Sequence, residues 1–167
     1  MRDHLIVRPA RPDDIDALVT FSAAMARETE GRELELERLR RGTLAVFGSP
    51  ERGFYLVAEL SGEPSGRLIG QLMVTYEWSD WRNATFWWIQ SVYVHPSWRR
   101  RGVYRRMHEC ILHQARSRSD VCGVRLYVEK NNAVAHTAYD HVGLSRSGYV
   151  VFEDDFVLST KELHGKE

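Results

Sequence analysis

The fold is decided by the stretch Val92-Tyr93-Val94-His95-Pro96-Ser97-Trp98-Arg99-Arg100-Arg101-Gly102-Val103-Tyr104. A β-branched run that ends at a proline is typical of a strand, and apolar side chains recur at helical spacing after Gly102. The first N–H groups of a helix have no internal partner, and the helix dipole is positive there, so this junction favours an anion. Gly102 permits close approach of the backbone, and arginines can pair with phosphate. The stretch therefore predicts an anion-binding loop, although three arginines before a helix also fit a solvated surface.

Composition limits the alternatives. Lys plus Arg and Asp plus Glu number 23 each, so no global field attracts nucleic acid. The arginines also lack the interleaved aromatic residues of a nucleic-acid surface. No apolar stretch approaches the roughly 18 residues of a membrane span, and the N-terminus has no signal-peptide core. Two cysteines do not make a disulfide framework. We expect a cytoplasmic protein with neither a nucleic-acid nor a membrane partner.

The chain around this stretch reads as one α+β domain over residues 1–167. Periodicity predicts helices over 13–25, from 36 to 44, from Gly102 onward and over 132–141. It predicts strands over 5–7, 54–58, 68–78, 86–94 and 124–128, with a closing pair over 149–152 and 156–158. We therefore expect a mixed, mostly antiparallel twisted sheet of about six to seven strands flanked by about four helices.

A second motif follows the basic loop by about 30 residues. It reads Leu126-x-Val128, then Asn132-x-x-Ala135-x-x-x-Tyr139-x-x-x-Gly143. Asn132, Ala135 and Tyr139 share one helical face. Each also has a structural explanation, since Asn132 is a good N-cap and Tyr139 would fill a core.

Together the two motifs resemble the coenzyme A signature of the GNAT N-acetyltransferase superfamily. That signature is a strand often ending in Val-x-Pro, then Gln/Arg-x-x-Gly-x-Gly/Ala at a helix start. Arg99 and Gly102 match it, whereas Tyr104 stands where the family usually has Gly or Ala. An aromatic ring there must point away from the phosphates or stack against the cofactor.

The resemblance implies transfer of an acetyl group from acetyl-CoA to a primary amine by direct attack in a ternary complex, with no metal. The amides of Ser91, Val92 and Val94 would polarise the carbonyl, Tyr139 would protonate the thiolate, and Asn132 would bind the pantetheine. The cofactor-binding residues implied are Val92, Tyr93, Val94, Arg99, Arg100, Arg101, Gly102, Val103, Tyr104, Asn132, Ala135 and Tyr139.

The resemblance identifies neither the base nor the acceptor. Many relatives carry a Glu on the strand before the loop, but this chain has Trp87-Trp88-Ile89-Gln90-Ser91 there. Three carboxylates could act through water, Glu77, Asp80 and Glu153, or the amine could lose its proton to solvent. Aromatic and acidic residues favour a small cationic acceptor. The acceptor-binding residues predicted are Glu77, Trp87, Ser91 and Glu153.

Two alternatives stay open at this point. A catalytically silent acyl-CoA sensor of the same fold is the main one, because the strand Glu is missing and Tyr104 is unusual. A nucleic-acid-binding protein that uses Arg99 to Arg101 is the second, and it is weaker because no aromatic-interleaved basic surface accompanies them. The sequence does not decide between a monomer and a homodimer.

Overall fold

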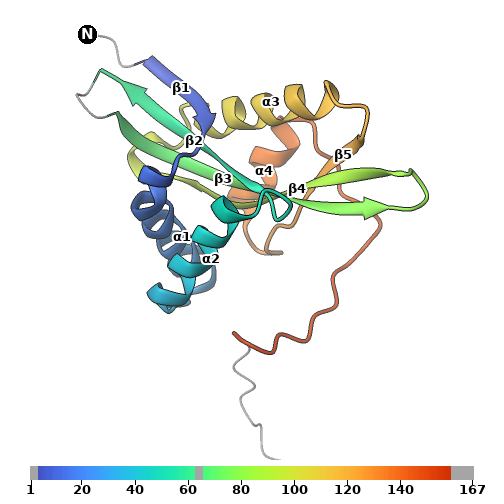
Figure 1. Ribbon diagram of the computed structural model, residues 1–167, viewed down its shortest axis with the longest axis horizontal. Helices are drawn as coiled ribbons and strands as arrows, with labels where there is room; N and C mark the ends of the chain where they lie inside the picture. The colour runs from blue at the N-terminus through green and yellow to red at the C-terminus, as the bar shows by residue number, and fades with distance from the viewer. Residues whose placement is uncertain (1–3, 63–65, 159–167) are drawn as a thin grey trace, which may run out of the picture.

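The computed structural model describes residues 4–62 and 66–158, which form a curled sheet with helices on both faces (Figure 1). The strands are β1 (His4–Pro9), β2 (Phe54–Ser61), β3 (Arg67–Ser79), β4 (Ala84–Val94) and β5 (Val121–Leu126). The helices are α1 (Ile15–Glu30), α2 (Leu36–Gly48), α3 (Val103–Arg116) and α4 (Ala133–His141), with short 3-10 turns at Pro12–Asp14 and Pro96–Trp98. The α+β class is confirmed.

The sheet follows chain order, β1-β2-β3-β4-β5. The first four strands pair antiparallel, which confirms the meander, and β4 pairs with β5 in parallel. A parallel pair needs a crossover connection, and α3 provides it. The basic loop is thereby placed at the end of β4, where the chain leaves the sheet.

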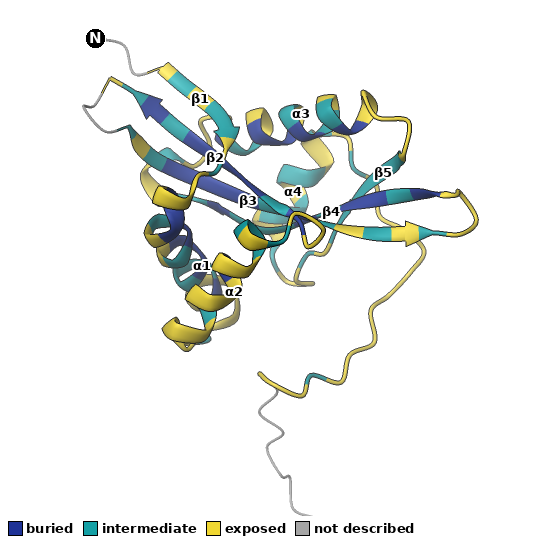
Figure 2. Cartoon of the chain, viewed as in Figure 1, coloured by how far each residue is buried: buried dark blue, intermediate teal, exposed yellow. Residues whose placement is uncertain are grey.

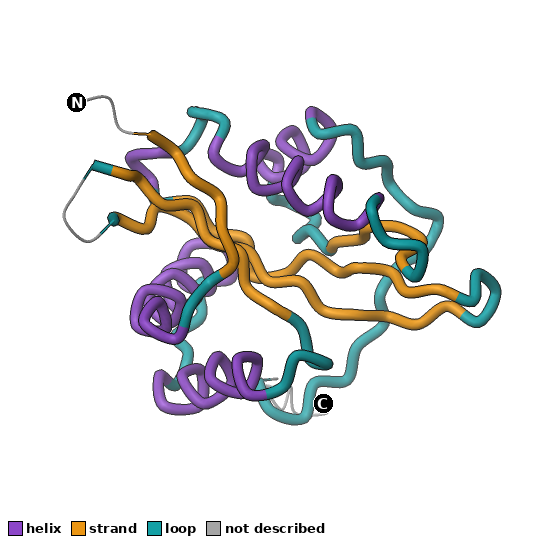
Figure 3. The backbone as a smooth tube through the Cα atoms, turned by 45° about the horizontal axis from the view of Figure 1, so that its top comes forward, coloured by secondary structure: helices purple, strands orange, loops and turns teal. Residues whose placement is uncertain are grey.

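Helices cover both faces of the sheet, and the hydrophobic core is larger on one face than on the other. Figure 3 shows α3 on one side and the α1–α2 pair on the other. The larger core lies under α3 and includes Leu56, Leu72, Val74, Trp87, Ile89, Val103, Met107 and Ile111. A smaller core of Leu18, Tyr55 and Val57 lies under α1 and α2. Most burial is therefore along the strands and on the inner face of α3, as Figure 2 shows. No helix in the part of the chain that the structure describes is long and apolar enough to cross a membrane.

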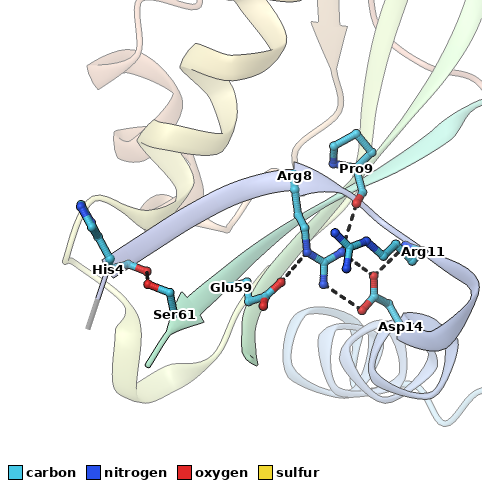
Figure 4. Close-up of polar contacts among 7 residues, drawn as sticks. All are labelled: His4, Arg8, Pro9, Arg11, Asp14, Glu59 and Ser61. Carbon is cyan, nitrogen blue, oxygen red and sulfur yellow. Dashed lines mark hydrogen bonds and ion pairs between the residues drawn. The ribbon is translucent and has the colours of Figure 1, made fainter. Parts of the chain in front are cut away.

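An ion-pair network fixes the start of α1 against the sheet (Figure 4). Arg8 on β1 donates to Asp14 Oδ2 at 2.8 Å and also pairs with Glu59 on β2. Burial of Asp14 opposes ionisation, but the hydrogen bonds from Arg8 and from the Arg11 amide prevail and lower the pKa of this carboxyl. The network therefore anchors the start of α1 to β1 and β2.

The predicted closing pair of strands is wrong, so the sheet has five strands among the described residues. β5 also begins earlier than expected, at Val121. Residues 149–158 lie outside the sheet. Their backbone makes local hydrogen bonds instead, and Asp155 Oδ1 accepts from the amides of Val157 and Leu158. Arg32 then donates to the Leu158 carbonyl at 2.7 Å, so the segment runs back toward the end of α1.

Candidate functional site

A β-bulge in β4 centres on Ser91. Met73 on β3 is opposite Gln90, whereas Gln71 is opposite Tyr93, so β4 carries one extra residue, and Ser91 has a φ of 51°. Before the bulge, Ile89 faces α3. After it, Val92 packs toward α3, while the Tyr93 ring stacks on Phe21 of α1. The bulge therefore reverses the alternation of side chains at the predicted thioester site.

β4 and β5 separate at the same level. Their pairing ends at Ile89 opposite Leu126, so residues 90–94 have no partner on β5 among the residues that the structure describes. Unpaired backbone groups along a strand can accept an extended ligand in β-like fashion. The separation therefore fits the pantetheine arm of a coenzyme.

The basic loop turns sharply into α3. Arg100 and Gly102 both have left-handed backbone conformations, with φ of 60° and 78°. The Arg106 amide makes the first helical bond, to the Gly102 carbonyl, so the amides of residues 103–105 precede the helical ladder. A Cβ at Gly102 would meet no described atom within 4 Å, so the approach to these amides is open. The helix start therefore fits a pyrophosphate.

The three arginines have different surroundings. Arg99 donates to the Val94 carbonyl at 2.9 Å, pairs with Glu28 of α1 and lies 5.4 Å from the Tyr93 ring centre. Arg101 lies 5.0 Å from the ring centre of Trp98. Arg99 thus ties the loop to α1, and the phosphates are left mainly to the backbone and the two arginines that follow.

Tyr104 points toward α4. Its ring contacts that of Tyr139 edge to face, with centroids 5.5 Å apart, and its hydroxyl lies 3.2 Å from His108 Nδ1. Burial raises the pKa of both phenols, and for Tyr104 the neighbouring Tyr139 adds to the effect. Burial lowers the pKa of His108, so its imidazole is held neutral. Tyr139 is therefore a neutral phenol with a proton to donate.

Asn132 and Ala135 form the start of α4. Asn132 is the N-cap, and its Oδ1 accepts from the Ala135 amide at 3.0 Å. Tyr139 lies two turns further along the same helix, so capping sets the direction from which its ring approaches Tyr104.

The other candidate residues do not converge on the bulge. Glu77 accepts from Trp88 Nε1 at 2.7 Å and pairs with Arg125. Asp80 belongs to the turn between β3 and β4, on the order of 25 Å along the strand from Ser91. Trp87 is buried on the α3 face against Phe54, and Glu153 is exposed on the segment after α4.

A pocket that the sequence did not indicate opens beside the bulge. It has a volume of about 310 Å³ and lies between α1, α2 and the sheet. Its lining residues are Ser22, Met25, Leu34, Leu39, Gly42, Thr43, Val46, Tyr55, Met73 and Ser91. The one signal in the sequence was Gln71, a polar residue within an apolar strand, which is fully buried and bonds to both Ser22 and Ser91.

Comparison with known proteins gives consistent results. The sequence profile described as the Acetyltransferase (GNAT) family matches residues 17–144. A possible acetyltransferase from Clostridium difficile 630 is 36% identical, with a TM-score of 0.83 over 92% of this chain and 98% of that one. A search of curated proteins finds no match.

More distant structures share the fold. One, from Clostridium acetobutylicum, is described as a predicted acetyltransferase with acetyl-CoA; it is 16% identical, with a TM-score of 0.71 over 90% of this chain and 96% of that one. The aminoglycoside N-acetyltransferase AAC(6')-Iy, in complex with CoA, is 11% identical, with a TM-score of 0.73 over 93% and 97%.

Proposed function

Because the chain belongs to the GNAT acetyltransferase family, we propose that it transfers the acetyl group of acetyl-CoA to a primary amine by direct attack in a ternary complex. One observation carries the proposal. The bulge at Ser91 lies where β4 leaves β5, on the strand that leads directly into the open start of α3. A strand edge for an extended arm and a helix start for an anion are thus joined by eight residues of loop, from His95 to Gly102.

The backbone supplies most of the binding. The amides at the start of α3 hold the pyrophosphate, and Arg100 and Arg101 add charge at the rim. The edge of residues 91–94 that has no partner on β5 among the described residues holds the pantetheine arm and offers N–H donors to a carbonyl oxygen. When bound, acetyl-CoA supplies the thioester that the amine attacks.

Tyr139 acts as the acid. Its pKa is raised by burial, so the phenol keeps its proton at neutral pH and can donate it to a leaving thiolate. Tyr104 supports the ring from the side.

The amine loses its proton to solvent. Gln90 in the position of the family's Glu cannot accept a proton, and it donates to Thr75 Oγ1 at 2.6 Å. Glu77 is engaged by Arg125 and Trp88, which ties its carboxylate to a structural role.

The test is thiol release from acetyl-CoA across amines, amino acids, aminoglycosides and peptides. Tyr139→Phe should lower kcat by about 10²-fold or more while the affinity for CoA is retained. Tyr149→Phe, on the exposed segment after α4, is the matched control and should change neither. Binding of CoA without thiol release for any acceptor would favour the silent acyl-CoA sensor, and an unchanged kcat in Tyr139→Phe would exclude Tyr139 as the acid.

We also propose a homodimer. Tyr149, Phe152 and Phe156 are 76%, 93% and 90% exposed, and the outer edge of β5 pairs with no strand in the described part of the chain. Apolar segments and free strand edges are unfavourable in water, and a second copy would cover both. Light scattering should give a molar mass twice that of the chain. Phe152→Asp combined with Phe156→Asp should reduce the molar mass to that of a single chain. A monomeric wild-type protein at ~50 μM would reject this proposal.

A further inference from the structure

The pocket between α1 and α2 has a polar end and an apolar body. The polar end is Ser22 and Ser91, the residue of the β4 bulge. Gln71 holds them together, because its Nε2 donates to Ser22 Oγ at 2.9 Å and to the Ser91 carbonyl at 3.2 Å. The Ser91 carbonyl also fixes which way the Gln71 amide faces, since only the amide nitrogen can donate to it.

Apart from Gly42, Thr43 and Tyr55, the body of the pocket is built from aliphatic and thioether side chains. Met25 of α1, Leu39 and Val46 of α2, Met73 of β3 and Leu34 of the α1–α2 connection surround it. Thr43 adds little polarity, since its hydroxyl donates to the Leu39 carbonyl within the helix. Such a lining favours burial of an apolar group. That group would lie next to the bulge, because Ser91 lines the same pocket.

No carboxylate occurs among the described residues that line this pocket. The acids of α1 and the α1–α2 connection are engaged elsewhere: Asp16 pairs with Arg40, Glu28 with Arg99, Glu30 with Arg32 and Glu33 with Arg27, and Glu35 caps α2. A polycationic acceptor would therefore enter without a counter-ion, which is unfavourable. A neutral amine needs none, and only the neutral amine has the free electron pair for attack.

We infer that the acceptor is a primary monoamine on an apolar body, with the amine at Ser22 beside the bulge and the apolar body between α1 and α2. This inference rests on the proposed acetyl transfer. It narrows the acceptor to amines with an aliphatic or thioether substituent. Ser22 Oγ, held by Gln71, retains a lone pair to accept from the amine N–H.

The first experiment compares acceptors of one chemical series. With n-alkylamines, kcat/KM should rise about fourfold per added methylene until the pocket is full. A diamine of the same length should be at least tenfold poorer, because its second charge is buried without a partner. A flat series, or a preference for the diamine or an aminoglycoside, would overturn the inference.

The second experiment fills the pocket. Gly42 lines it, and a Cβ added there meets no described atom within 4 Å, so Gly42→Leu should place its side chain in the space without clashing. KM for hexylamine should rise at least tenfold, with KM for acetyl-CoA unchanged. Gly48→Leu is the matched control: the same helix, the same open surroundings and no place in the pocket lining.

The third experiment tests the polar end. Ser22→Ala should raise KM for hexylamine about two- to tenfold, as expected for one lost hydrogen bond, and Ser22→Thr should restore it. Equal behaviour of both variants would exclude the hydroxyl as the amine's partner.

Calorimetric binding of hexylamine to the protein–CoA complex tests the acceptor pocket separately from acetyl transfer. Binding that Gly42→Leu weakens and Gly48→Leu does not, without any turnover, would retain the pocket and reject acetyl transfer. Turnover of amines that neither chain length nor Gly42→Leu affects would retain acetyl transfer and reject the pocket.

Discussion

The ring of Tyr104 in α3 contacts the ring of Tyr139 in α4 edge to face, with centroids 5.5 Å apart. Tyr104 stands at the last position of the coenzyme A motif, where the family usually has Gly or Ala. Its side chain points away from the loop, so the ring occupies the space between two helices and leaves the phosphate approach open. Position 104 has thereby become a support for the residue expected to act as the acid.

Tyr104→Ala should therefore damage catalysis more than cofactor binding. Removal of the ring should cost about 3 kcal/mol of stability, and kcat should fall because Tyr139 loses a packing surface, while KM for acetyl-CoA changes little. Tyr104→Phe is the control: it loses only the bond to His108 and should cost about 1 kcal/mol with kcat nearly retained. Steady-state kinetics and urea unfolding measure both. An unchanged kcat in the alanine variant would contradict the supporting role.

The plot of kcat against pH should show no decrease below pH 10, because Tyr139 should keep its proton up to that pH. Burial raises the pKa of Tyr139 above its usual value near 10, so the phenol remains protonated through that pH and only then loses the ability to donate. We expect kcat for a fixed alkylamine to rise or stay level up to pH 10. A limb that descends below pH 9 in wild type, and disappears in Tyr139→Phe, would contradict the raised pKa.

His108 should make the fold sensitive to mild acid. It is fully buried, burial lowers its pKa below 6.5, and its Nε2 has no hydrogen-bond partner among the described residues. As pH falls below about 6.5, the unfolded chain binds a proton that the folded chain does not, so the free energy of unfolding decreases. His108→Gln should lose less stability between pH 7.5 and pH 5.5 than wild type in urea unfolding. Equal losses would show that His108 does not contribute.

Gly102→Ala should weaken cofactor binding beyond its cost to the fold. The left-handed φ of 78° costs an alanine about 1 kcal/mol, and the new methyl group lies in the open approach to the α3 amides. Gly31→Ala is the matched control, because Gly31 has a φ of 61° with equally open surroundings but ends α1. Both should lose similar stability by thermal unfolding, and only Gly102→Ala should raise KM for acetyl-CoA. A similar KM in the two variants would argue against the anion site.

Local patterns were predictable where one element decides the outcome. The strand before Pro96, the helix start at Gly102 and the cap at Asn132 each depend on a few neighbouring residues, and the structure contains all three. The helices and the meander were predictable for the same reason, since apolar periodicity reports which face of an element is buried.

The prediction of two closing strands was wrong because a β-strand forms only when it pairs with another strand. Tyr149 to Phe152 has the composition of a strand, but no described strand pairs with it, and β-propensity says little about pairing. The prediction that Trp87 binds the acceptor beside Ser91 is not supported by its position, since Trp87 is buried on the α3 face. The bulge at Ser91 reverses the alternation along β4, and a sequence pattern of period two does not reveal where a residue is inserted.

The sequence by itself determined the family, through two motifs whose chemistry is carried by adjacent backbone and by residues one or two helical turns apart. Only the tertiary structure decided where Tyr104 points, which arginine is tied to α1, and that Ser22, Gln71 and Ser91 meet at the end of an apolar pocket. Those three residues belong to three different elements. Their meeting depends on sheet register and on helix packing across the chain, which no local pattern encodes.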